Sequence, residues 1–159
     1  MLQIREVAES DLDGLLALYA HFERPDDSSP EGIARAWQEV LEHPGLFVYV
    51  GEVAQQLVSS CTLVVVPNLR SGPRPYGLIE LVVTHSNFRR MGYGTAVLKY
   101  ALAAAWKMEC YKVMLLTGRT DEGVLRFYEG GGFIRGRKTG FVAAATPRNQ
   151  GAAQLRLAD

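Results

Sequence analysis

Residues 85–96 read HSNFRRMGYGTA, and this stretch decides how the chain folds. It follows an apolar run, Leu78 to Thr84, that is typical of a strand, and it precedes a helically periodic stretch that begins near Thr95. Glycine permits a sharp turn and lets another molecule approach the backbone closely. The first N–H groups of a helix have no partner within the helix, and the helix dipole adds partial positive charge there. The joint is therefore a candidate anion site, and its two arginines add charge-assisted hydrogen bonds.

The same pattern has a purely structural interpretation, because glycine turns also precede helices in proteins that bind no phosphate. Two other phosphate loops are excluded by the residues. The chain has no G-x-x-x-x-G-K-[ST], and it has no G-x-G-x-x-G directly after a strand with an acid about 20 residues further on. The spacing alone fits both interpretations, an anion site and a simple turn.

The composition is that of an ordinary globular domain. The 159 residues are 48% hydrophobic, so we expect one domain over 1–145 and a tail over 146–159. Seventeen basic and seventeen acidic side chains cancel, which gives no reason to expect a nucleic-acid or membrane partner. No segment has the roughly 20 apolar residues of a membrane span or a signal-peptide pattern, so we expect a cytoplasmic protein. Cys61 and Cys110 lie in apolar sequence without zinc-ligand spacing, which predicts buried thiols and no metal site.

Hydrophobic periodicity predicts the order strand, helix, helix, three strands, helix, strand, helix, strand. The predicted strands are 2–7, 46–53, 57–66, 78–84, 113–117 and 133–143. The predicted helices begin after Ser10 or Asp11, after Ser29 with proline in the first turn, near Thr95 and near Asp121. The short connection 54–56 predicts a hairpin, and the helix over 95–108 predicts a crossover between strands. We therefore expect an α+β fold with a central mixed, mostly antiparallel sheet flanked by helices.

Two motifs in the second half carry a family resemblance. Arg89-Arg90-Met91-Gly92-Tyr93-Gly94 matches the R/Q-x-x-G-x-G/A signature of the GNAT N-acetyltransferase superfamily. Phe127-Tyr128-Glu129-Gly130-Gly131-Gly132-Phe133 resembles the F-Y-x-x-x-G-F signature that ends the same domain. The resemblance implies a GNAT fold, with a sheet that splays between its fourth and fifth strands. It also implies direct transfer of an acetyl group from acetyl-CoA to a primary amine of a small molecule or peptide, and a homodimer.

The resemblance implies coenzyme-binding residues at three places. The backbone amides of one run would hold the pyrophosphate: Arg89, Arg90, Met91, Gly92, Tyr93, Gly94 and Thr95. The strand edge at Val82, Val83 and Thr84 would pair with the pantetheine arm as an added strand. Asp121 stands where many relatives have an asparagine that touches this arm. A carboxylate accepts hydrogen bonds but cannot donate them as an amide does.

Acetyl transfer to an amine needs a base and an acid. An amine with a free pKa of about 10 is protonated at neutral pH, so a group must take its proton. Glu80 in the apolar run LIELVV is the candidate base, directly or through a water, because burial favours the protonated carboxyl. The open alternative is a glutamate that faces solvent or pairs with Arg74. By the resemblance, Tyr128 is the candidate acid for the leaving thiolate; alternatively it is a core ring with its hydroxyl at the surface.

The resemblance places the acceptor pocket near residues 21–31 and 68–76. In the first segment, Asp26, Asp27 and Glu31 would attract a cationic amine. In the second, Arg70, Arg74 and Tyr76 would instead hold a phosphate or carboxylate of the acceptor. The open alternative is that either set is a solvated loop, and the mixture selects no acceptor. Two other functions stay open, namely a non-catalytic acyl-CoA sensor and a different nucleotide-phosphate binder that uses the same turn.

Overall fold

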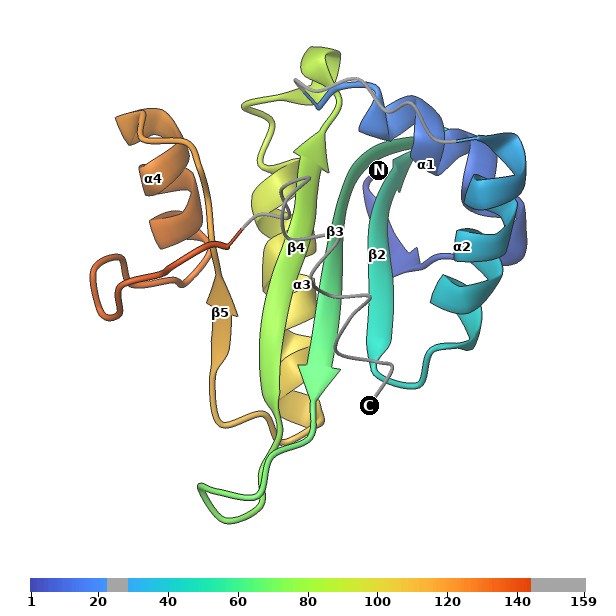
Figure 1. Cartoon of the computed structure of the whole chain (residues 1–159). Helices are drawn as coiled ribbons and strands as arrows, with labels where there is room; N and C mark the ends of the chain where they lie inside the picture. Colours follow the sequence, from blue (N-terminus) through green and yellow to red (C-terminus); the bar gives the residue numbers. More distant parts are fainter. Residues whose placement is uncertain (23–28, 144–159) are drawn as a thin grey trace.

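The computed structural model describes residues 1–22 and 29–143, and its centre is one five-stranded sheet (Figure 1). In spatial order the strands are β1 (Gln3–Glu6), β2 (Leu46–Val53), β3 (Gln56–Val66), β4 (Tyr76–Thr84) and β5 (Val113–Leu115). All neighbouring strands are antiparallel except β4 and β5, which are parallel. This mixed sheet with flanking helices confirms the predicted α+β class.

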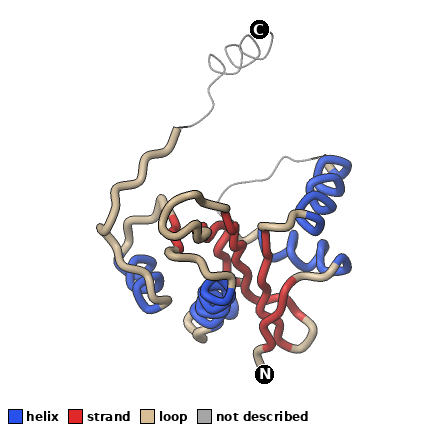
Figure 2. Tube along the Cα trace, turned by 90° about the horizontal axis from the view of Figure 1, so that it is seen from below, coloured by secondary structure: helices blue, strands red, loops and turns tan. Residues whose placement is uncertain are grey.

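The helices cover both faces of the sheet (Figure 2). They are α1 (Leu12–Tyr19), α2 (Pro30–Glu42), α3 (Tyr93–Lys107) and α4 (Glu122–Gly130), with short 3-10 turns η1 (Glu9–Asp11) and η2 (Ser86–Phe88). Ser29 begins α2 as expected, because its hydroxyl accepts a hydrogen bond from the backbone N–H of Gly32 at 3.1 Å. No helix in the described ranges is long and apolar enough to cross a bilayer.

Alternation along the strands gives each face of the sheet its own core. On the face of α3, a cluster contains Tyr49, Cys61, Leu63, Ile79, Val97, Ala101, Ala105 and Cys110. On the face of α1 and α2, a second cluster contains Leu15, Leu18, Trp37, Val48, Val50, Leu57 and Val83. Both cysteines are free and buried, as the sequence predicted, and burial raises the pKa of Cys61 to about 12.

Strand β4 loses its neighbour halfway along its length. Residues 77–79 pair with β5, which ends at Leu115, and no described strand borders that edge over 80–84. On its other edge, β4 carries a bulge, since Ser60 pairs with Val83 but Thr62 pairs with Glu80. Leu81 in this bulge has a φ of 49°, a left-handed conformation that is strained for leucine. The sheet is therefore open at the upper end of β4, which confirms the expected splay.

The predicted last strand over 133–143 is wrong, because these residues form turns and irregular backbone. Gly132 and Gly136 have φ angles of 107° and 73°, and these left-handed residues interrupt an extended pattern. Phe141 and Val142 are 90% and 82% exposed, so no sheet face covers them in the described part of the chain. The expected tail over 146–159 lies outside the described residues. Elsewhere the differences are small, since β4 and α3 each begin two residues earlier than predicted.

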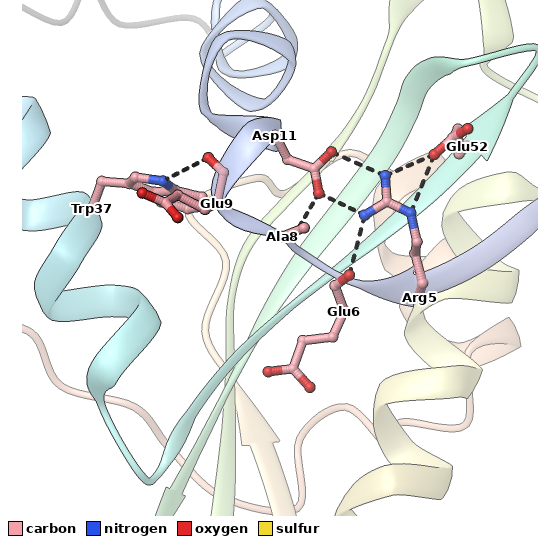
Figure 3. A network of polar contacts seen from close by, with 7 residues as sticks. All are labelled: Arg5, Glu6, Ala8, Glu9, Asp11, Trp37 and Glu52. Atoms are coloured by element: carbon pink, nitrogen blue, oxygen red, sulfur yellow. Dashed lines mark hydrogen bonds and ion pairs between the residues drawn. The ribbon is translucent and has the colours of Figure 1, made fainter.

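Arg5 fastens β1 to η1 and β2 (Figure 3). Its Nε and Nη2 donate to Glu52 Oε2 at 3.2 and 2.7 Å, and Nη2 also donates to Asp11 Oδ1 at 2.9 Å. Its Nη1 donates to the other Asp11 oxygen and to the Glu6 carbonyl. Asp11 also accepts a hydrogen bond from the Ala8 backbone N–H at 2.7 Å. The guanidinium lowers the pKa of Asp11, and the network as a whole holds the first strand in the sheet.

We predict that Asp11→Asn lowers the free energy of unfolding at pH 7 by about 1–3 kcal/mol, since it breaks a partly buried ion pair. The pKa of Asp11 is lower in the folded chain than its unfolded value of 3.8. Its contribution is therefore present above pH 3.8 and is lost as the pH falls through the folded pKa. Urea titrations at pH 7 and pH 2.5 measure this, with Asp13→Asn on the exposed side of α1 as the control. An equal loss at both pH values would contradict the assignment.

Candidate functional site

The turn between β4 and α3 has an open, left-handed backbone. Gly92 is the N-cap of α3 with a φ of 81°, and Arg90 has a φ of 62°. No atom lies within 4 Å of the place where a Cβ on Gly92 would stand. This turn therefore needs glycine for its conformation and leaves space in front of the helix N-terminus. Backbone N–H groups beside such a space form a site for an anion.

Gly94 in the same motif has a different role. A Cβ on Gly94 would lie 2.8 Å from Thr84 Oγ1 and 3.1 Å from the ring of Phe127. Thr84 Oγ1 is held in place by a 3.0 Å hydrogen bond with Ser59 Oγ. Gly94 thus lets the first turn of α3 pack directly on β4 and α4. From the sequence motif, both glycines were expected to serve anion binding, whereas in the structure Gly94 is needed for close packing.

The arginines of the turn lie at the protein surface. Arg89 is exposed, and its Nε donates to the Thr84 carbonyl at 3.2 Å, so it spans the end of β4. Arg90 is exposed as well, and Met91 has 56% of its surface exposed. The ring centroids of Phe88 and Tyr93 lie 6.2 Å apart, so the two rings pack together at the turn. The positive charge at the mouth of the turn is therefore available to a ligand in solution.

Tyr128 of α4 lies close enough to Glu80 of β4 for the two charges to interact. Burial raises the pKa of Tyr128 most, the Thr117 hydroxyl lowers it, and the carboxylate of Glu80 raises it further. Tyr128 is half-buried, and its ring lies against Phe127 and Phe133, with centroids 5.0 and 6.5 Å away. Glu80 is exposed, so its predicted burial is wrong. Since β5 ends at Leu115, it leaves this side chain uncovered.

A cavity of about 490 Å³ lies between α1, α2 and the sheet. It reaches β4 at the bulge residue Leu81 and β3 at Thr62. Its other lining residues are Leu12, Leu15, Leu16, Tyr19, Ser29, Gly32, Ile33, Arg35, Ala36, Trp37, Val40, Leu46 and Val48. The cavity therefore adjoins the open part of β4 from the face opposite α3.

Thr62, which lines this cavity, and Ser60, two residues before it on β3, both carry buried hydroxyls. Thr62 is 4% exposed and Ser60 is fully buried, and neither hydroxyl has a hydrogen-bond partner among the described residues. Both lie near the hydroxyl of Tyr19, whose pKa is raised by burial and lowered by these two groups. A buried hydroxyl without a partner costs about 1–3 kcal/mol. Such a cost at one end of a cavity points to a ligand-binding role.

The family model described as "Acetyltransferase (GNAT) family" matches residues 11–133. The chain belongs to this family. It is 30% identical over 134 residues to a glucosamine 6-phosphate N-acetyltransferase of Trypanosoma brucei brucei, which covers 83% of this chain and 88% of the relative.

Solved structures extend the comparison. A putative acetyltransferase from Agrobacterium tumefaciens is 41% identical, with a TM-score of 0.83, and covers 90% of this chain and 99% of its own. A structure from Bacillus halodurans, described as a transcriptional regulator, is 25% identical, with a TM-score of 0.79, and covers 91% and 100%. The GNAT fold expected from the two motifs is thus confirmed, and the family model and the acetyltransferase relatives support an acyltransferase activity.

Asp121 sits at the start of α4 and caps it. Its Oδ1 accepts a hydrogen bond from the Val124 backbone N–H at 3.1 Å, and its Oδ2 lies 3.1 Å from Arg119 Nε. The hydrogen bond from Val124 is the main cause of its lowered pKa, and Arg119 adds to it. The capping role is thus visible in this GNAT domain, whereas contact with the pantetheine arm stays a prediction.

The structure does not bring Arg74 and Tyr76 to the cavity. Both lie at the opposite end of β4 from the turn, roughly 25 Å away at the rise of an extended strand. Arg74 Nε donates to the Glu109 carbonyl at 3.2 Å, and Lys112 Nζ lies 5.2 Å from the centre of the Tyr76 ring. The cavity in this GNAT domain is formed by α1, α2 and the sheet at the bulge, and contact of Arg74 and Tyr76 with an acceptor stays a prediction. Asp26 and Asp27 lie outside the described residues.

The hydroxyl residues Tyr19 and Thr62, which line the cavity, and Ser60 near Thr62 were not predicted from the sequence. An available signal was the pair Ser60 and Thr62, spaced by two in the run from Leu57 to Val66, whose one other hydroxyl residue is Ser59. Because strand residues alternate between faces, this spacing places both hydroxyls on one face.

We predict that Gly94→Ala lowers the melting temperature by several degrees, because the added methyl group overlaps Thr84 and Phe127. Differential scanning calorimetry measures the shift. Gly130→Ala is the matched control, since a Cβ at that helical glycine meets no atom within 4 Å. If both variants melt at the same temperature, the close packing of α3 on β4 and α4 is not needed for stability.

Proposed function

We propose that this protein is an N-acetyltransferase that transfers an acetyl group directly from acetyl-CoA to a primary amine of a small molecule or peptide. The observation that carries the proposal is the open edge of β4 over 80–84. This edge ends at the glycine turn, faces Tyr128 across the gap left by β5, and adjoins the cavity at Leu81. An anion site, a proton donor and an acceptor pocket thus meet at one stretch of backbone.

The residues of this site fit acetyl-CoA. The backbone amides of 89–95 would hold the pyrophosphate, and the space in front of Gly92 gives access to them. The edge of β4 at Val82 to Thr84 has no described strand beside it, so it would pair with the amide groups of the pantetheine arm. When bound there, acetyl-CoA supplies a thioester that reacts with amines.

Tyr128 and Glu80 would divide the proton transfers. As nitrogen bonds to the acyl carbon and the carbon–sulfur bond breaks, the amine loses a proton and the thiolate gains one. Because the pKa of Tyr128 is raised, its phenol stays protonated at neutral pH and would donate to the thiolate. Glu80 is exposed at the same edge and would accept the amine proton, directly or through a water. A backbone N–H near the bulge would polarise the acyl carbonyl.

A non-catalytic acyl-CoA sensor is the second candidate function. The similarity to the Bacillus halodurans structure described as a transcriptional regulator favours it. The phosphate turn would serve either function, whereas a sensor needs no proton donor at the edge of β4. The half-buried Tyr128 opposite Glu80 therefore favours the enzyme.

We predict that Tyr128→Phe lowers kcat about 10²-fold or more, without changing the Kd for acetyl-CoA, since the phenol is needed only to protonate the thiolate. Because the pKa of Tyr128 is raised, mainly by burial, we further expect this acid to lose activity at a higher pH than an exposed phenol would. CoA release with a panel of amines measures the rate, and titration calorimetry measures binding. Tyr100→Phe, at a partly exposed tyrosine of α3, is the control. Tight coenzyme binding without turnover in the unaltered protein would favour the sensor.

We predict that Gly92→Ala weakens acetyl-CoA binding at least tenfold, because a Cβ would enter the open space in front of the turn and strain the backbone. Gly118→Ala is the matched control, since a Cβ there also meets no atom within 4 Å. Calorimetric Kd values for the folded variants measure the effect. Equal affinities for Gly92→Ala and the unaltered protein would place the coenzyme elsewhere.

A further inference from the structure

The cavity between α1 and α2 has walls that are almost entirely apolar. Among the described residues that line it, none is an aspartate or glutamate, and Arg35 is the one charged side chain. Its volume of about 490 Å³ lies within the usual range for a small-molecule site. A polycation would find no described carboxylate there, and a sugar phosphate would place most of its hydroxyls against leucine, isoleucine, valine and tryptophan.

Thr62 supplies a polar group at the end of this cavity nearest the open part of β4. Its hydroxyl is buried and has no partner among the described residues. The register pairs Thr62 with Glu80, directly beside the bulge at Leu81. The cavity thus offers a hydroxyl next to the strand where acetyl transfer is proposed.

We propose that the acceptor is a primary amine on an apolar body, aromatic or branched aliphatic, and that the Thr62 hydroxyl accepts a hydrogen bond from its nitrogen. This inference rests on the proposed acetyltransferase function. The apolar body would fill the space between α1 and α2. A neutral hydroxyl and apolar walls favour the neutral amine over the ammonium ion, because they do not compensate the lost hydration of a charge. The neutral amine is also the form that attacks the thioester.

A direct test compares acceptors of different chemistry under saturating acetyl-CoA. We expect kcat/KM for 2-phenylethylamine and isoamylamine to exceed that for spermidine, kanamycin and glucosamine 6-phosphate at least tenfold. If acetyl-CoA binds and the polar amines react as fast or faster, the inference fails and the proposed function stands. The inference also fails if acetyl-CoA binds and no amine of the panel reacts. If acetyl-CoA neither binds nor is consumed, both fail.

Replacement of Thr62 tests the role of its hydroxyl. Thr62→Val keeps the shape and removes the oxygen, so we expect KM for 2-phenylethylamine to rise at least fivefold with the Kd for acetyl-CoA unchanged. Thr62→Ser keeps a hydroxyl and is expected to stay within about twofold of the unaltered protein. Since the hydroxyl has no hydrogen-bond partner among the described residues, Thr62→Val should not lower the melting temperature. Equal KM values for Thr62→Val and Thr62→Ser would overturn the assignment.

A charge placed on the cavity wall tests the preference for an apolar body. Ala36 lines the cavity from an exposed position of α2, and Ala34 is exposed on the same helix but does not line it. We expect Ala36→Asp to lower kcat/KM for 2-phenylethylamine at least tenfold and to raise that for spermidine. The matched variant Ala34→Asp is expected to change neither. If the two variants behave alike, the amine body does not occupy this cavity.

Discussion

The proposed active site depends on the end of the pairing between β4 and its parallel neighbour β5. Over 77–79 the two strands are paired, and from Glu80 onward one edge of β4 has no strand beside it in the described part of the chain. Backbone N–H and C=O groups at such an edge need partners, and an extended ligand can supply them. The bulge at Leu81 lies in this same stretch, and Leu81 lines the cavity. One break in pairing thus produces both the coenzyme edge and access to the acceptor side.

The parts around this edge are held by close packing. Gly94 brings α3 against β4 and Phe127, so the helix N-terminus stands at the end of the open edge. On the other face, Trp37 donates a hydrogen bond from Nε1 to the Glu9 carbonyl at 3.2 Å, which fixes α2 to η1 (Figure 3). The cavity therefore has a wall anchored to the start of the chain. A site assembled from rigid elements keeps its geometry better than one built on loops alone.

Much of the fold was predictable because its signals are local. Alternating apolar residues, the Ser29-Pro30 helix start and the two glycine motifs gave the order of elements and the family. The wrong strand over 133–143 had apolar residues, but it follows the left-handed Gly132 and contains the left-handed Gly136, whose conformations depend on tertiary context. The exposure of Glu80 and the position of Arg74 depend on where β5 ends, and the run LIELVV carries no information about that. The hydroxyl of Thr62 becomes a candidate ligand-binding group only because α1 and α2 form a cavity beside it.

Hydrogen exchange with and without acetyl-CoA tests the coenzyme site at the β4 edge, because it reports on backbone N–H groups themselves. We expect slower exchange on binding at two places, the β4 edge over 82–84 and the turn over 89–96. Exchange in β1, which Arg5 holds at the far edge of the sheet, should not change. Protection confined to other segments, or no protection at saturating acetyl-CoA, would contradict the assignment of the open β4 edge as the coenzyme site.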